Sequence, residues 1–226
     1  NMLRNLGKIK PEKQSKLTYG ETVNRERSKF LERRLPMQEI SCDLVPLTTS
    51  GEFKYVHVFL DLATQYMWAF KHRRKDEAYL SLREVIEFAK IHRHRIQKLI
   101  TDAAGVYYGQ DWKRECVTGE IDHHILMPRS QQQNPVERAI QTLKQRWRAT
   151  LQHAMLPQRR FAIMILPEVV KRMNMIGRKK FAYETPHYRM FNAHPDYSGV
   201  HIIGARSALL RPASHIKGGA QYESLG

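Results

Sequence analysis

The chain has 226 residues, a formal net charge of +16 at pH 7 and two cysteines. That length can bury the core of one large domain, and the lack of a long apolar run or a signal-peptide pattern predicts a soluble intracellular protein. Two isolated cysteines exclude a disulfide framework and a Cys-x-x-Cys metal site, and a charge this far from zero favours a polyanionic partner, nucleic acid rather than a membrane surface.

Residues 1–34 contain many Lys, Arg and Gln residues and few large apolar ones. This composition predicts an extended basic arm or linker, for which a DNA-binding arm and a disordered tail are both compatible readings. We therefore divide the chain into this arm, a core domain over residues 35–158, and a core-associated helix with an irregular extension over residues 159–226.

From residue 35 onward, runs rich in β-branched and aromatic residues alternate with stretches of helical periodicity. The first three runs, which are separated by short turns, predict antiparallel strands over residues 39–45, 55–62 and 66–70. Two further strands and four helices are predicted after them. The strands cover residues 96–100 and 121–127, and the helices cover residues 75–91, 110–118, 135–154 and 159–175. In the first of these helices, one side carries Leu80, Val85, Phe88 and Ala89 and is expected to face the core.

This order of elements predicts an α/β domain with a five-stranded mixed sheet flanked by helices. Helical crossovers in such a domain place the ends of the first and fourth strands side by side. In the last helix, Pro167 favours a break or kink. The sequence becomes irregular after residue 181, with one short strand expected over residues 200–203.

A polar run from Arg129 leads directly into the third helix, where Asn134 is a good N-cap and Pro135 suits the first helical position. Apolar residues then recur at steps of three and four and predict a buried stripe. The stripe comprises Val136, Ile140, Leu143, Trp147, Leu151 and Ala154. A second set lies one position further on and predicts a more exposed edge. It comprises Glu137, Gln141, Lys144 and Arg148.

Three acidic residues occupy positions at which this topology could bring them together. Asp43 interrupts the first strand, Asp102 ends the fourth, and Glu137 lies in the first turn of the third helix. Converging carboxylates could hold two hard divalent cations that activate a water or a 3′ hydroxyl for phosphoryl displacement. The alternative is that Asp102 caps a turn, Asp43 pairs with an arginine and Glu137 only favours a helix N-terminus. Spacing alone leaves both interpretations open.

Three blocks of the sequence resemble the D, D and E motifs of retroelement integrase cores, which have an RNase H-like fold. The blocks are Asp43, Thr101-Asp102 and Gln133–Arg138. The third block is similar to the Q-N-G-V-A-E-R pattern of copia-type retrotransposons. The strand pair that ends at Trp68 and the later Thr185-Pro186 segment extend the similarity over roughly residues 35–205.

The resemblance implies a DDE-type DNA integrase that uses two Mg²⁺ or Mn²⁺ ions held by Asp43, Asp102 and Glu137. Such an enzyme trims a 3′ end of the element's DNA and joins it to target DNA, which implies a nuclear location, a homo-oligomer and no membrane partner. Lys144 is the first candidate for gripping the terminal DNA, and Gln141 is the second. The other candidate DNA-binding residues are Arg129, Arg138 and Arg148.

Three features depart from the family pattern. Ala103-Ala104 follows the second acid where the family has Asn-Gly, Pro135 replaces a glycine, and we expect no zinc site in this chain. We therefore retain a second hypothesis, a domesticated and catalytically silent integrase-derived protein that binds or organises DNA. A nuclease of the same fold is a third.

Overall fold

The computed structural model describes residues 35–47, 51–126, 134–204, 207–210 and 222–225. Two sequence predictions therefore fall outside the described residues, the basic arm over residues 1–34 and the role of Arg129. Within the described part, no helix combines the length and the apolar character that crossing a membrane requires.

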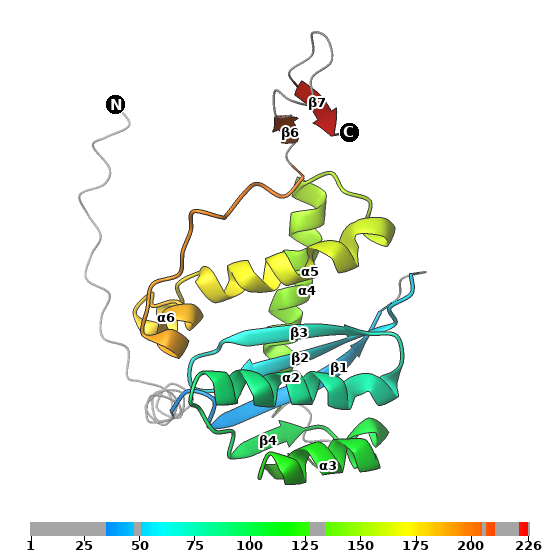
Figure 1. The fold of residues 1–226 in the computed structure, drawn as a ribbon, viewed down its shortest axis with the longest axis vertical. Helices are drawn as coiled ribbons and strands as arrows, with labels where there is room; N and C mark the ends of the chain where they lie inside the picture. The colour runs from blue at the N-terminus through cyan, green and yellow to red at the C-terminus, as the bar shows by residue number, and fades with distance from the viewer. Residues whose placement is uncertain (1–34, 48–50, 127–133, 205–206, 211–221, 226) are drawn as a thin grey trace, which may run out of the picture. The chain divides into compact units, whose positions relative to one another are not determined.

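A five-stranded mixed sheet lies at the centre of the fold, in the order β3-β2-β1-β4-β5 (Figure 1). β1 (Glu39–Pro46), β2 (Tyr55–Asp61) and β3 (Met67–His72) are antiparallel neighbours. β4 (Lys98–Thr101) pairs in parallel with β1, and β5 (Asp122–Ile125) pairs in parallel with β4. The predicted five-stranded mixed sheet is confirmed, and β1 and β4 end at the same side of it.

Helices cover both faces of this sheet, with α2 and α3 on one face and α4 and α5 on the other. The long helices are α2 (Ala78–Ile91), α3 (Gln110–Thr118), α4 (Pro135–His153) and α5 (Gln158–Met175). The short ones are η1 (Lys75–Glu77), η2 (Gly105–Tyr108), η4 (Lys179–Phe181) and α6 (Pro186–Phe191). A separate two-stranded sheet pairs β6 (Ser207–Leu210) with β7 (Tyr222–Leu225).

Alternation along β1 decides which side chains meet which helices. Ile40 and Cys42 are buried in the apolar cluster under α2 and α3, whereas Val45 belongs to the cluster under α4 and α5. Because successive strand residues point to opposite faces, Ser41 and Asp43 share the face of Val45. The acid in β1 is therefore directed to the α4 side of the sheet.

The predicted apolar stripe of α4 is confirmed at its main positions. Val136, Ile140, Leu143 and Leu151 are buried, and Trp147 packs against the same cluster while its indole N–H donates to the Ala162 carbonyl at 2.8 Å. An amphipathic helix needs such a stripe to remain on the sheet.

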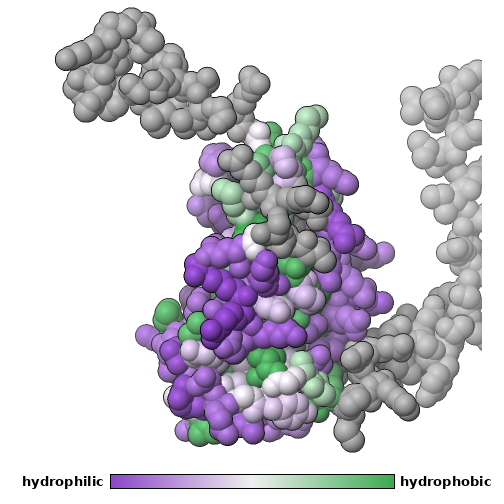
Figure 2. Space-filling view, turned by 90° about the vertical axis from the view of Figure 1, so that its right-hand side faces the viewer, coloured by the Kyte–Doolittle hydropathy of each residue, from purple (hydrophilic) through white to green (hydrophobic). Residues whose placement is uncertain are grey.

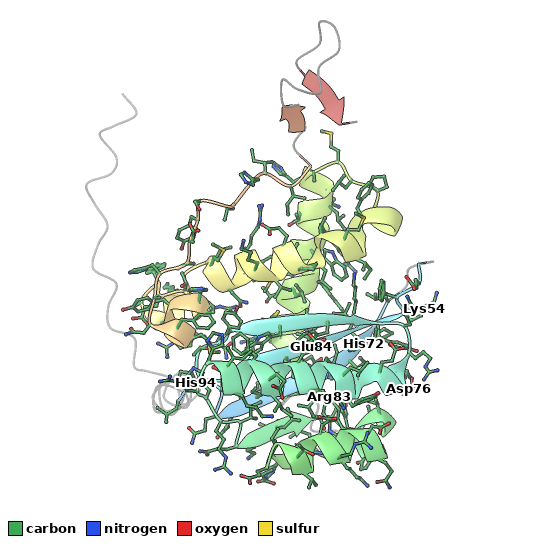
Figure 3. All side chains as sticks on the ribbon, in the orientation of Figure 1. Lys54, His72, Asp76, Arg83, Glu84 and His94 are labelled. Atoms are coloured by element: carbon green, nitrogen blue, oxygen red, sulfur yellow. The ribbon has the colours of Figure 1, made fainter. Side chains whose placement is uncertain are left out.

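The predicted apolar face of α2 needs one correction. Leu80 is 38% exposed rather than buried, and the face that packs on the sheet carries Leu82, Val85 and Ala89. Arg83 lies on the side of α2 that faces α3 (Figure 3), where its guanidinium donates to the Glu115 carboxylate at 2.5 Å.

The C-terminal part departs from the predicted elements in two places. Helix α5 is not broken at Pro167, which lies on the exposed side of the helix, where water can bond to the carbonyl that loses its partner. Residues 200–203 do not form a strand, since Ile202 is 71% exposed and only Ile203 packs against the core. The pattern missed α6, which begins at Pro186 with the Thr185 hydroxyl as its N-cap.

Asn174 connects α5 to the outer strand of the sheet. Its side-chain oxygen accepts from the Met67 main-chain N–H at 2.9 Å, and its amide donates to the Met67 carbonyl at 2.8 Å. Asn174 is buried, so these two bonds satisfy main-chain groups on β3 that have no strand partner on that side.

We expect Asn174→Ala to lower the free energy of unfolding by about 2 to 3 kcal/mol, because it leaves two buried main-chain groups without partners. Urea denaturation measures this loss. Gln152→Ala, on the exposed surface of α4, is the control and should change stability by no more than about 0.5 kcal/mol. Equal losses in the two variants would contradict the role of Asn174.

Candidate active site

One open pocket of about 310 Å³ lies where β1 and β4 end. It brings together acidic residues from three separate segments: Asp43 from β1, Asp102 directly after β4, and Glu137 from α4. The pocket is lined by Asp43, Leu44, Val45, Pro46, Asp102, Asn134, Glu137, Ile140, Gln141 and Lys144. Figure 2 views the side of the molecule to which β1 and β4 run, and it shows mostly hydrophilic residues with a few isolated apolar ones.

The carboxyl of Asp43 lies in an environment that disfavours its ionised form. Burial raises the pKa of its carboxyl, and the negative charges of Asp102 and Glu137 raise it further. The Leu44 main-chain N–H and the Lys144 ammonium act in the opposite direction but do not cancel the rise in this pKa. Asp102 and Glu137 are therefore each close enough to Asp43 to disfavour its ionised form, and an added cation would stabilise the ionised carboxylate of Asp43.

Asp102 is held by a turn of its own loop. Its Oδ1 accepts from the Ala104 main-chain N–H at 3.2 Å, two residues further on. The neighbouring Thr101 hydroxyl, which is buried, lies 2.9 Å from Nε2 of His123 on β5. Since the turn is closed by the main chain, the family's asparagine at position 103 is not needed to hold Asp102 in place.

Asn134 fixes the start of α4 relative to β1. Its Oδ1 accepts from the Ser41 hydroxyl at 2.6 Å and from the Val136 main-chain N–H at 3.3 Å. Ser41 is two residues before Asp43 on the same face of β1, and Glu137 is three residues after Asn134. The pair therefore sets the separation between two acids of the pocket. The sequence predicted the cap, but no local signal identifies its partner 93 residues away.

The predicted DNA-binding residues divide into two groups. Gln141 and Lys144 line the acidic pocket together with Glu137. Arg138 and Arg148 are exposed on α4 and do not line it. Arg129 and residues 131–133 of the polar run lie outside the described residues. The functional roles of all these residues remain predictions.

The pocket has the donor chemistry that divalent cations such as Mg²⁺ require, because carboxylate oxygens are their preferred protein ligands. The repulsion that Asp102 and Glu137 exert on Asp43 also favours cation binding. Within the described residues, however, no three His, Cys, Asp or Glu side chains lie in metal-binding arrangement. The residues thus fit a cation by type and location, and side-chain rotation would have to complete a shared site.

A buried polar chain lies on the other face of the sheet, next to the pocket. The Ser81 hydroxyl donates to the Ala78 carbonyl at 2.7 Å, so it accepts from Nδ1 of His57 at 2.6 Å and from Nε2 of His72 at 3.1 Å. This assignment leaves Nε2 of His57 as the acceptor for the Tyr107 hydroxyl at 3.3 Å. His57 is therefore satisfied only when neutral.

Tyr107 connects this chain to the acidic side. It lies in η2, shortly after Asp102, and its hydroxyl also hydrogen-bonds to the Cys42 thiol beside Asp43. Its side chain is fully buried in the core. Tyr107 thereby links the loop after Asp102 to β1 and β2.

Other polar residues near the sheet lie outside the pocket. Asp61 binds its own turn, since its Oδ2 accepts from the Thr64 main-chain N–H at 2.9 Å and from the Thr64 hydroxyl at 2.6 Å. Cys42 and Cys116 are buried free thiols.

Comparison with known proteins supports one family. The chain matches no protein-family model. It is 24% identical over 170 residues to the retrovirus-related Pol polyprotein from transposon TNT 1-94 of Nicotiana tabacum. The match covers 74% of this chain, and it spans only 13% of the polyprotein.

Solved integrase structures share the fold. The dimeric catalytic core of HTLV-2 integrase, in complex with magnesium, aligns with a TM-score of 0.53 and 15% identity over 68% of this chain and 95% of that chain. A simian T-cell lymphotropic virus intasome in complex with PP2A regulatory subunit B56 gamma gives a TM-score of 0.59 and 18% identity over 85% of this chain and 68% of that chain. The predicted RNase H-like fold and the resemblance to a retroelement integrase core are thereby confirmed.

We expect Asn134→Ala to destabilise the start of α4 by about 1 to 2 kcal/mol, because it removes the cap and leaves the buried Ser41 hydroxyl without its acceptor. Ser41→Ala keeps the cap and should cost about 1 kcal/mol or less. Hydrogen exchange at the amides of residues 136–138 measures the difference. Unchanged protection in Asn134→Ala would show that the cap does not hold this end of the helix.

Stability should fall on acidification because of His57. Burial, and secondly the neighbouring His72, lowers the pKa of His57 to about 3, whereas an unfolded histidine takes up a proton below about pH 6.5. The unfolded chain therefore binds more protons between these values, and stability should decrease by up to about 1.4 kcal/mol per pH unit as the pH falls through this window.

Urea denaturation at neutral pH and at about pH 5 measures this decrease, because the histidine contribution falls in that window. His57→Gln should show a smaller decrease than the unmodified chain, whatever its stability at neutral pH. His124→Gln, which changes an exposed histidine, is the control. The assignment to His57 would be wrong if the free energy of unfolding of both variants decreased with falling pH as steeply as that of the unmodified chain.

Proposed function

From its retroelement integrase core, we propose that the chain is a metal-dependent polynucleotidyl transferase that trims a DNA 3′ end and joins it to target DNA. The observation that carries the proposal is the pocket in which Asp43, Asp102 and Glu137 meet beside Gln141 and Lys144. The charges of Asp102 and Glu137 disfavour ionised Asp43, so bringing these acids together from three segments does not stabilise the fold. Their convergence favours a functional role.

Asp43, Asp102 and Glu137 are the proposed ligands of Mg²⁺ or Mn²⁺, with two ions as in the sequence-based expectation. When bound, such ions would supply activation of a water or a 3′ hydroxyl and stabilisation of the leaving oxygen. No covalent intermediate with a side chain is needed. The magnesium in the HTLV-2 integrase core supports this choice of cofactor.

Lys144 and Gln141 would position the DNA end. They follow Glu137 by seven and four residues and line the same pocket, so an ammonium and an amide lie along one edge of α4. An ammonium group there can bind a phosphate oxygen near the reacting bond. Arg138 and Arg148 would contact DNA outside the pocket, and so would Arg129 by the sequence-based prediction.

The proposal extends to partners and location. Joining two element ends to one target requires more than one active site, so we propose a homo-oligomer that binds both element DNA and target DNA. The dimeric and trimeric forms of the HTLV-2 integrase core, the second with a TM-score of 0.55 and 14% identity over 69% of this chain and 97% of that chain, are consistent with assembly. Chromosomal target DNA implies the nucleus.

The second candidate is a catalytically silent DNA-binding or architectural descendant of an integrase. Ala103-Ala104 beside Asp102 is the observation that favours it, because the family's asparagine amide is lost from the edge of the pocket. Asp102 retains its turn without that amide, so the substitution alone does not remove the acid from the pocket.

The experiment that separates them is a strand-transfer assay with Mg²⁺ or Mn²⁺, a labelled DNA end and a target plasmid. We expect joined product from the unmodified chain and a loss of about 100-fold or more in Glu137→Gln, Asp43→Asn and Asp102→Asn, because each removes a ligand. Glu87→Gln, which alters an exposed acid on α2, is the matched control and should retain activity.

Fluorescence anisotropy with the same DNA measures binding in parallel. If the chain binds DNA but joins none, and Glu137→Gln binds DNA equally well, the chain is a catalytically silent DNA-binding protein rather than a transferase. Cleavage of the labelled end without joining would instead indicate a nuclease.

A further inference from the structure

A group of positively charged side chains lies away from the acidic pocket, around the loop of residues 177–184 between α5 and α6. We name it the cationic surface. It comprises Arg138 and Arg146 of α4, Arg178 and Lys180 of the loop, and Arg189 of α6. We propose that the cationic surface is a second DNA-binding site, which holds the phosphate backbone of double-stranded DNA independently of base sequence.

The loop is tightly closed on itself. The Arg178 carbonyl accepts from the main-chain N–H groups of Phe181 at 2.9 Å and Tyr183 at 3.0 Å, and the Arg178 N–H donates to the Glu184 carbonyl at 3.1 Å. A Cβ at Gly177 would lie 2.1 Å from the Tyr183 carbonyl oxygen, so no larger residue fits there. The backbone thus presents Arg178 and Lys180 in a fixed geometry.

The loop also carries backbone strain. Ala182 and Tyr183 are two consecutive non-glycine residues with positive φ, at 50° and 69°. Non-glycine residues seldom adopt such conformations, which are retained at functional sites more often than elsewhere. Phe181 anchors the loop, because it is buried with Cζ of Arg189 3.9 Å and Nζ of Lys180 4.7 Å from its ring centre.

One flank of α4 supplies the other part of the cationic surface. Arg138 and Arg146 are eight residues apart, about two helical turns, and therefore lie on one side of the helix. Arg146 lines a small cavity of about 80 Å³ together with Gly177 and Arg178. Positions 138 and 146 lie roughly 100° or more around the helix from Glu137, so this flank differs from the one that faces the acidic pocket.

Within the described part of the chain, an acidic side chain pairs with only one member of the cationic surface, Arg189. Among the described residues, Glu184 pairs with Arg189 at 3.0 Å, and no acidic side chain forms an ion pair with Arg138, Arg146, Arg178 or Lys180. Several other arginines are paired with acids, as Arg83 is paired with Glu115 and Arg95 with Glu120. The unpaired cations of this surface are therefore available to bind an anion from outside the chain.

The pKa values of Lys180 and Arg178 show that this arrangement of positive charges is electrostatically unfavourable. Burial, and secondly the charges of Arg178, Arg189 and Arg138, together lower the pKa of Lys180 to about 8. Burial and then the charge of Arg146 lower the pKa of Arg178. Cations that repel one another in the free protein are stabilised when phosphates bind between them.

The side-chain types of the cationic surface indicate which ligand it binds. Arginine guanidinium groups bind phosphate oxygens in a two-pronged geometry, and several of them spread over a loop and a helix match a repeating phosphate backbone rather than a single anion. Phosphate contacts position DNA without reading its sequence. This inference rests on the proposed function. It extends that function because some of the residues that bind DNA would lie outside the acidic pocket.

The test uses the full chain and Arg178→Gln/Lys180→Gln, with a short fluorescent duplex and anisotropy measured between about 50 and 200 mM salt. We expect roughly tenfold weaker binding, and a decrease of about 2 in the magnitude of the slope of log affinity against log salt, one for each lost phosphate contact. Binding should weaken equally for unrelated duplex sequences.

The control variant is Lys90→Gln/Arg95→Gln, which removes the same formal charge from residues that are paired with Glu87 and Glu120. Arg138→Gln/Arg146→Gln tests the same surface from the exposed flank of α4, in case the loop variant does not fold. The proposal is overturned if either pair at the cationic surface binds DNA with the affinity and salt slope of the control.

The two proposals fail differently. If the chain joins no DNA but its DNA binding weakens in the loop variant, the proposed catalysis is refuted and the proposed second DNA-binding site is supported. If the chain joins DNA but its loop variant binds DNA like the control variant, the second site is refuted and the catalysis is supported.

Discussion

Repulsion among like charges at one end of the sheet is the constraint on which the rest of this structure depends. Asp43, Asp102 and Glu137 line one pocket with only one lysine among its lining residues, Lys144. The fold holds each acid by a different device. The β1 register places Asp43, a main-chain turn holds Asp102, and the Asn134 cap positions the helix that carries Glu137. A pocket of this charge admits a phosphate readily only after cations neutralise it.

Helix α4 connects this pocket to the remainder of the molecule. One flank carries the apolar stripe that packs on the sheet, the next carries Glu137, Gln141 and Lys144, and a third carries Arg138 and Arg146. The periodicity of about 3.6 residues per turn makes this division possible within a single element. Packing, acidic pocket and cationic surface are therefore coupled through the orientation of one helix.

Two departures from the family pattern have a physical explanation in this arrangement. Pro135 occupies the first position of α4, where its missing N–H would have no helical partner, and Asn134 before it supplies the cap. Ala103 follows an acid whose turn is closed by the Ala104 main-chain N–H. Neither substitution removes a contact that holds an acid in the pocket.

Much of the fold could be read from the sequence because its signals are local. Strand alternation, the apolar stripe of α4 and the Asn134-Pro135 start are properties of neighbouring residues, and the spaced acids resembled one family. Leu80 and residues 200–203 were misassigned because apolar character alone does not tell which side of an element meets the core. Helix α5 passed through Pro167 because packing and exposure override a single local preference.

The sequence by itself determined the charge of the chain, the types of its elements and the acids to be considered. Only the tertiary structure decided that Ser41 meets Asn134 across 93 residues, that Gln141 and Lys144 share the acidic pocket while Arg138 does not, and that Arg178 and Lys180 stand near Arg138 and Arg146. The physical reason is that hydrogen bonds and electrostatic interactions depend on distance in space, and folding brings together residues whose separation along the chain carries no signal.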